Sequence, residues 1–207
     1  MSDRKHIAGL ILSGGRATRM GGGDKTLRPL GGGTMLSQVI SRLAPQVAHC
    51  AISANGDPAR LSEFGLPVIA DTAGAGPLAG ILAGMEWARP FASHILTVAG
   101  DTPFFPADLC ERLEAAKEDE AGRIAVACSD GEQHPTFALW PVALHDELLA
   151  FLGGQHKFRV RAFIESHDFV EVDFPMLDAA GKIVDPFFNI NTPGDLDEAE
   201  AIVQALT

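Results

Sequence analysis

A short segment near the N-terminus combines glycines with a local excess of positive charge. Arg16, Arg19, Lys25 and Arg28 lie within thirteen residues, and Asp24 is the one acid in that stretch. Glycine lets backbone N–H groups approach an anion closely, while arginine and lysine neutralise its charge. Because the whole chain has a formal net charge of −11, this local excess of cations predicts a loop that binds a small anion such as phosphate. The alternative, a solvated basic loop, leaves the glycines unexplained.

The spacing in this loop fits neither of the two commonest phosphate-binding patterns. A Walker-type loop has its lysine directly after a glycine, whereas here Asp24 precedes Lys25. A dinucleotide-binding loop reads G-x-G-x-x-G, and no glycine of the segment begins that pattern. Gly14 and Gly15 still allow close backbone approach at the end of an apolar run, and Arg19 and Lys25 can neutralise a triphosphate. A third type of nucleotide loop is therefore expected.

Other polar side chains end apolar runs further along the chain. Asn55, Asp71 and Asp101 each follow a run typical of a buried strand. Asp101 is the best candidate for a Mg²⁺ ligand, since Mg²⁺ prefers a few protein oxygens with water and phosphate, but it is also a candidate turn residue, as is Asp71. Asn189 and Asn191 alternate in "NIN" and are expected to point the same way, toward phosphate or metal-bound water. The alternative is a pair that caps a turn.

The elements that position these residues are predicted from the hydrophobic periodicity. Apolar runs alternate with segments of helical spacing over the first two-thirds of the chain, which indicates a mostly parallel sheet covered on both faces. We therefore expect an α/β fold with a three-layer αβα architecture and a ligand site beyond the carboxyl ends of the strands. Strands are expected in 7–12, 47–55, 66–71, 93–101, 136–142 and 168–174. Helices are expected after Thr34, in 78–85, 105–122, 144–152 and 158–166, and after the Thr-Pro-Gly-Asp cap at 192–195.

The composition narrows the class of protein further. With 207 residues, 46% of them hydrophobic, the chain is expected to form one domain over residues 1–207. The acidic charge argues against binding to nucleic acid or to an anionic membrane, and no apolar run reaches the roughly 20 residues of a membrane span. Cys50, Cys110 and Cys128 are far apart and are expected to be small core residues of a cytoplasmic protein.

At the glycine loop the sequence resembles the Rossmann-like nucleotidyltransferases, and among them the molybdenum cofactor guanylyltransferases of bacteria. The signature of that family, L-A-G-G-x-x-x-R-M-G-G-x-D-K, is matched by LSGGRATRMGGGDK at residues 12–25, with serine in place of alanine. The resemblance continues through GPLAGILAGM (76–85), GDTPF (100–104), HPTFALW (134–140) and FFNINTPGDL (187–196). It covers nearly the whole chain and is weakest between about residues 153 and 182.

This resemblance implies transfer of GMP from GTP to the phosphate of molybdopterin, with Mg²⁺ and with release of pyrophosphate. Arg19 and Lys25 would stabilise the leaving pyrophosphate, Asp101 would bind the metal, and Asn189 and Asn191 would lie near the acceptor. His134 is expected to be a turn residue or an acceptor contact. The residues expected to contact GTP are Leu12, Ser13, Gly14, Gly15, Lys25, Asn55, Asp71 and Asp101. The resemblance also implies transient contacts with other cofactor-biosynthesis proteins and with molybdoenzymes.

Two other functions share this loop. A cytidylyltransferase for the same cofactor or a sugar-phosphate nucleotidyltransferase would have a similar first loop, although "GGGDK" and "PLAGI" resemble the guanylyl group more. A non-catalytic nucleotide-binding protein on the same fold is expected to have lost Lys25 or Asp101, and this sequence retains both.

Overall fold

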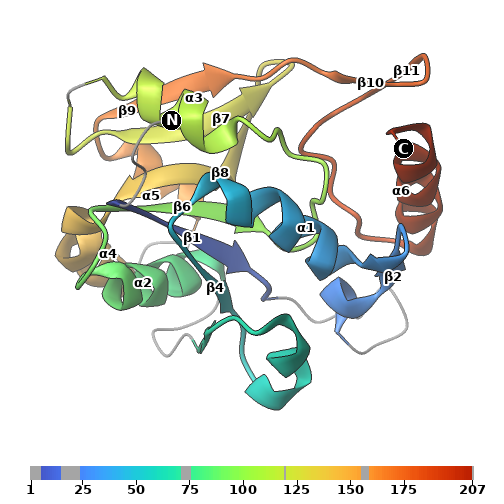
Figure 1. The fold of residues 1–207 in the computed structure, drawn as a ribbon. Coiled ribbons are helices and arrows are strands. Elements are labelled where there is room, and N and C mark those ends of the chain that lie inside the picture. Colours follow the sequence, from blue (N-terminus) through green and yellow to red (C-terminus); the bar gives the residue numbers. More distant parts are fainter. Residues whose placement is uncertain (1–5, 15–23, 71–75, 119, 155–158, 207) are drawn as a thin grey trace.

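A seven-stranded sheet forms the centre of the molecule (Figure 1). The computed structural model describes residues 6–14, 24–70, 76–118, 120–154 and 159–206. β8 runs antiparallel to both of its neighbours, and the other six strands of the sheet share one direction. The mostly parallel sheet is therefore confirmed. In spatial order the strands are β5 (Val68–Ile69), β4 (His49–Ser53), β1 (Ile7–Leu12), β6 (His94–Ala99), β8 (Glu132–Pro141), β7 (Ile124–Ser129) and β9 (Phe169–Asp173).

The first strand, β1, lies in the interior of this sheet and is buried on both faces. Ile7 and Ile11 belong to the core on one side of the sheet, and Ala8 and Leu10 belong to the core on the other. All four side chains are fully buried. Successive side chains of a strand point to opposite faces, so a strand covered by helices on both faces must be apolar at every position.

Helices cover the two faces and make the three layers that the sequence predicted. On one face lie α1 (Met35–Leu43) and α3 (Leu109–Ala116), whose apolar side chains pack with those of β1 and β6. The other face is covered by three helices, which are α2 (Pro77–Ala88), α4 (His145–Leu152) and α5 (Val160–Glu165).

A hairpin carries the chain from the glycine loop into α1. Its strands are β2 (Pro29–Leu30) and β3 (Gly33–Thr34), and Gly31 and Gly32 both have positive φ angles at the turn, which glycine adopts without strain. Thr34 then caps α1, as predicted: its Oγ1 accepts from the Ser37 N–H at 3.1 Å, and the Thr34 N–H donates to Ser37 Oγ.

A third apolar cluster attaches the last helix, α6 (Pro193–Leu206), to the rest of the molecule. Ala199 and Ile202 of α6 are buried with Leu30 of the first hairpin and with a second hairpin, β10 (Leu177–Ala179) and β11 (Lys182–Val184). Figure 1 shows α6 beside β2, away from the helices that cover the sheet. Leu206, near the end of α6, is 44% exposed, because the cluster ends near Ile202.

Several element bounds differ from the prediction. The expected strand 66–71 is reduced to two residues, and a 3-10 helix, Pro58–Phe64, follows β4. The two hairpins were not assigned from the sequence. Cys110 and Cys128 are buried as expected, whereas Cys50 is half-buried, and burial raises the pKa of its thiol to about 12. Among the described residues, no helix is long and apolar enough to cross a membrane.

Glycine allows α2 to pack closely on β1. A Cβ atom at Gly84 would overlap the fully buried side chain of Leu10, with Leu10 Cδ1 and Cγ both 3.2 Å away. Small residues at such a position let a helix approach the sheet, so the backbone at the end of β1 is fixed relative to α2.

We expect Gly84→Val to lower the free energy of unfolding by about 1–3 kcal/mol, because the added atoms overpack this contact. Glycine and valine differ by only a few tenths of a kcal/mol in helix propensity, so the loss reports packing. Gly194→Val is the control, since a Cβ at Gly194 would meet one atom at 3.8 Å. Urea unfolding measures the free energy of unfolding of both variants. Equal stability of the two would contradict the packing argument.

Candidate active site

The carboxyl ends of three neighbouring strands bring the candidate site residues to one edge of the sheet. Leu12 at the end of β1 pairs with Ser53 of β4 on one side and with Ala99 of β6 on the other. The ladder continues for one step, because the Ser13 N–H donates to the Ser53 carbonyl at 2.9 Å and the Gly100 N–H donates to the Leu12 carbonyl at 3.0 Å. Residues that follow these strands therefore meet at this edge, as predicted.

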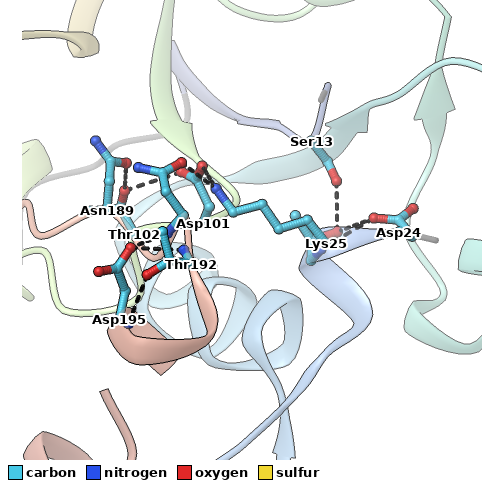
Figure 2. Close-up of polar contacts among 10 residues, drawn as sticks. Ser13, Asp24, Lys25, Asp101, Thr102, Asn189, Thr192 and Asp195 are labelled. Carbon is cyan, nitrogen blue, oxygen red and sulfur yellow. Dashed lines mark hydrogen bonds and ion pairs between the residues drawn. The ribbon is translucent and has the colours of Figure 1, made fainter. Parts of the chain in front are cut away.

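Lys25 connects three segments that are far apart in the sequence. Its Nζ donates to Asp101 Oδ2 at 2.6 Å and to Asn191 Oδ1 at 2.7 Å. The side chains of Lys25 and Asp101 are 13% and 26% exposed, so the ion pair is partly removed from water, and its hydrogen bond is charge-assisted. Figure 2 shows the Lys25 side chain extended toward Asp101, with Ser13 and Asp24 near its backbone.

The backbone of Asp101 holds the "NIN" segment. The Ile190 N–H donates to the Asp101 carbonyl at 3.0 Å, and the Ile190 side chain is fully buried. Asn189 and Asn191 on either side of it are exposed. The expected alternation is therefore present, but the segment is not a strand: it is irregular chain fixed by one backbone hydrogen bond and one buried side chain. Thr102 orients Asn189, since its hydroxyl donates to Asn189 Oδ1 at 2.5 Å.

Asp24 organises the backbone around Lys25. One of its oxygens, Oδ1, accepts from the Thr26 N–H at 3.2 Å and from the Thr26 hydroxyl at 2.9 Å. The Thr26 hydroxyl has a single proton, which it gives to the carboxylate, so the Ser13 hydroxyl, 2.9 Å away, must donate to Thr26. Asp24, the residue that interrupts the Walker spacing, therefore connects the lysine turn to the end of β1.

Two polar residues at the start of α6 fix the position of Asn191. Asp195 Oδ2 accepts from the Asn191 and Thr192 N–H groups at 2.7 and 2.8 Å, and the Asp195 N–H donates to Thr192 Oγ1. This is a capping box, as the Thr-Pro-Gly-Asp sequence predicted. The hydrogen bond from the Asn191 N–H is the largest cause that lowers the pKa of Asp195, and the charge of Lys25 acts in the same direction.

The structure brings together part of the predicted site. Lys25 contacts both Asp101 and Asn191, and Asn189 accepts a hydrogen bond from Thr102, the residue after Asp101. Leu12 ends β1, Ser13 and Gly14 follow it, and Asn55 is exposed beyond β4. Gly15, Arg19 and Asp71 lie outside the described residues. Sequence reasoning missed Thr26 and Thr102, because a threonine next to a motif residue carries no signal that its hydroxyl bonds across the site.

His134 is not a turn residue, because it lies within β8. Its Nε2 is 2.6 Å from Ser129 Oγ, which donates its own proton to Asp185 Oδ1 at 2.8 Å. The imidazole stacks on Phe187 with 4.4 Å between ring centroids, and burial lowers the pKa of His134. The ring is therefore held at Nε2 by Ser129 and on one face by Phe187. A contact with the acceptor stays a prediction.

The donor atoms around Asp101 suit a magnesium ion that keeps most of its water. Nowhere in the described ranges do three or more His, Cys, Asp or Glu side chains form a group that could enclose a metal. Mg²⁺ does not require such a group, since it is commonly held by one or two carboxylates together with water and substrate phosphates. Asp101 and the amide oxygens of Asn189 and Asn191 offer that kind of donor set.

The fold and the site together define a class of protein. A doubly covered, mostly parallel sheet presents a lysine, a carboxylate and two amides at its carboxyl edge, where Gly14 follows β1. Ligands of open α/β sheets bind at this edge, and these groups suit an anionic ligand such as a nucleotide phosphate. The molecule is therefore a nucleotide-handling α/β protein.

Comparison with known proteins identifies the family. The family model described as MobA-like NTP transferase domain matches residues 9–172. A molybdenum cofactor guanylyltransferase of Mesorhizobium japonicum is 54% identical over 208 residues, covering 99% of both chains, and one of Rhodopseudomonas palustris is 46% identical over 207 residues, covering 98% of this chain and 96% of the relative. The chain belongs to the MobA-like NTP transferases and is a nucleotidyltransferase.

Solved structures agree on the fold. Molybdopterin-guanine dinucleotide biosynthesis protein A of Archaeoglobus fulgidus superposes with a TM-score of 0.73 at 24% identity, covering 95% of this chain and 98% of that one. A 4-diphosphocytidyl-2C-methyl-D-erythritol synthase of Anaerococcus prevotii has a TM-score of 0.74 at 12% identity, covering 98% and 97%. The Rossmann-like nucleotidyltransferase architecture is thus confirmed.

We expect Asp195→Asn to lower the free energy of unfolding at pH 7 by about 1 kcal/mol, as is typical for a helix-capping group. The folded pKa of Asp195 is lowered, so its charge stabilises the fold above the ordinary pKa of about 3.9 and that contribution is lost as the pH falls through the lowered value. The difference between variant and wild type should therefore shrink on acidification, as measured by urea unfolding. Asp197→Asn, an exposed position of the same helix, is the control; a difference independent of pH would contradict the role of the charge.

Proposed function

We propose that this protein transfers GMP from GTP to the terminal phosphate of molybdopterin, releases pyrophosphate and forms the guanine dinucleotide form of the cofactor. The observation that carries the proposal is the Lys25–Asp101–Asn191 cluster at the carboxyl edge of the sheet. The names of relatives that match the chain over nearly its full length support the choice of donor and acceptor.

The reaction requires positioning and charge stabilisation more than proton transfer. An acceptor phosphate oxygen attacks the α-phosphorus of GTP in line, a new P–O bond forms, and the bond to the β-phosphate oxygen breaks as pyrophosphate leaves. The acceptor is already anionic at neutral pH, so no general base is needed. Catalysis then depends on bringing two anions together and on stabilising the negative charge that builds up on the leaving group.

The described residues are suited to these tasks. Lys25 is a compact cation whose side chain reaches across the edge of the sheet, so it would bind the β- and γ-phosphates together with Arg19. Asn189 and Asn191 are neutral donors and acceptors on the exposed side of Ile190, and they would orient the acceptor phosphate. The nucleoside would lie along the ends of β1, β4 and β5, against Leu12, Ser13, Gly14, Gly15, Asn55 and Asp71.

Asp101 would hold Mg²⁺ together with the nucleotide phosphates. The ion would neutralise phosphate charge and orient the transferred group. Asp101 Oδ2 contacts Lys25, so the lysine compensates the charge of the carboxylate. When phosphates are bound, Lys25 gains a second class of anionic partner at the same edge.

Cytidylyl transfer is the alternative reaction. The fold does not decide between the bases, since the Anaerococcus structure named as a diphosphocytidyl enzyme superposes as well as the molybdopterin-guanine protein does. The curated relatives at 46–54% identity favour guanine. We further propose one domain over residues 1–207, a cytoplasmic location, and transient contacts with other cofactor-biosynthesis proteins and molybdoenzymes.

The nucleotide preference tests the proposed reaction. Pyrophosphate release is measured with GTP, CTP, ATP or UTP, each with Mg²⁺ and molybdopterin. We expect turnover with GTP to exceed that with CTP by at least about tenfold, the discrimination that one or two hydrogen bonds to a base provide. Turnover with CTP and not with GTP would overturn the guanylyl assignment and favour the alternative.

We expect Lys25→Met and Asp101→Asn each to reduce turnover by about 100-fold or more, the loss typical when one electrostatic stabiliser of a developing charge is removed. Lys182→Met is the matched control, because Lys182 also contacts a carboxylate, Glu198 at 2.8 Å, on an exposed surface. Steady-state pyrophosphate release and circular dichroism are measured for all three. Near-normal turnover of either site variant would mean that its role is misassigned.

A further inference from the structure

Arg60 lies outside the signature loop but contacts it. It belongs to the 3-10 helix Pro58–Phe64, which follows β4. Its Nε donates to Asp24 Oδ2 at 2.9 Å, and its Nη1 donates to the Asp57 carbonyl at 2.7 Å. The side chains of Arg60 and Asp24 are 29% and 15% exposed. Hydrogen bonds from two different nitrogens fix the plane of the guanidinium, so the ion pair has one defined geometry.

The helix that carries Arg60 is itself well held. Asp57 caps it, since Asp57 Oδ1 accepts from the Ala59 N–H at 2.9 Å. Leu61 is fully buried in the same core cluster as Ile52 of β4. Arg60 is therefore presented by a packed element and not by a free surface loop.

Asp24 connects Arg60 to the site residues. While Arg60 holds Oδ2, Oδ1 accepts the N–H and the hydroxyl of Thr26, and the Thr26 hydroxyl accepts a hydrogen bond from Ser13. Lys25 lies between Asp24 and Thr26 in the chain, so both of its neighbours are fixed by the same carboxylate. The direction in which Lys25 leaves the backbone thus depends on the orientation of Asp24.

We propose that Arg60 is a positioning residue for nucleotidyl transfer, which acts through Asp24 to hold Lys25 and Ser13 in the geometry that binds the nucleotide phosphates. This inference rests on the proposed function for its reaction. It adds that the segment after β4 fixes residues 24–26, so the strand end that would face the nucleoside and the lysine that would face the triphosphate are connected by one ion pair.

The test measures kcat/KM for pyrophosphate release with the nucleotide that the wild type prefers. We expect Arg60→Met to lower it about tenfold, since small misplacements of catalytic groups have effects of this order or larger. Arg60→Lys, which keeps the charge, should recover part of the loss. In an Asp24→Asn background, Arg60→Met should lower kcat/KM little further, because Arg60 acts through Asp24. A full additional tenfold loss there would overturn the inference.

A matched control separates this role from general stability. Arg123 forms an ion pair of the same geometry, with its Nε 2.9 Å from Asp168 Oδ2, beside the start of β7 at the opposite edge of the sheet. Arg123→Met should leave kcat/KM within about twofold of the wild type, as is typical for an exposed ion pair away from the site. Hydrogen exchange of the Thr26 amide in the nucleotide-free protein should quicken in Arg60→Met and not in Arg123→Met.

The outcomes also distinguish this inference from the proposed function. If the wild type uses CTP and Arg60→Met lowers kcat/KM tenfold, the role of Arg60 is supported and guanylyl transfer is overturned. A wild type that uses GTP and is unaffected by Arg60→Met, with unchanged exchange at Thr26, would overturn the role of Arg60 alone.

Discussion

The ion pair between Lys25 and Asp101 is the contact on which the site depends. A partly buried charge loses hydration, and a partner of opposite sign at 2.6 Å compensates that loss. The two residues are 76 positions apart in the chain, and the parallel pairing of β6 with β1 places Asp101 at the edge of the sheet where the pair forms. Asn191 extends this pair by accepting from Lys25, and Asp24 fixes the backbone next to Lys25.

The sheet and the position of the site could be predicted from the sequence because both are encoded locally. β1 alternates Ile7 and Ile11 with Ala8 and Leu10, and the two sets face different helical layers. Asp101 directly follows an apolar run, so the parallel sheet predicts its place at the edge. The motif in the glycine loop identified Lys25 as a candidate phosphate ligand. These inferences need only periodicity, strand direction and spacing.

The connections within the site could not be predicted in this way. Thr102 and Asn189 are 87 positions apart, and Arg60 and Asp24 are 36 apart, so no local pattern reports that they meet. The hairpins β2–β3 and β10–β11 are too short to show periodicity, and β5 contributes only two residues to the sheet. "NIN" had the alternation of a strand, but its shape follows from a tertiary hydrogen bond to Asp101 and the buried side chain of Ile190.

The hold of the Asp101 backbone on Ile190 couples the two sides of the site. The carbonyl of Asp101 fixes the segment that carries Asn189 and Asn191, while the Asp101 side chain contacts Lys25. The side proposed for the nucleotide and the side proposed for the acceptor therefore share one residue. A shift of the backbone after β6 would displace both sides together, so a single peptide unit sets the spacing between donor and acceptor.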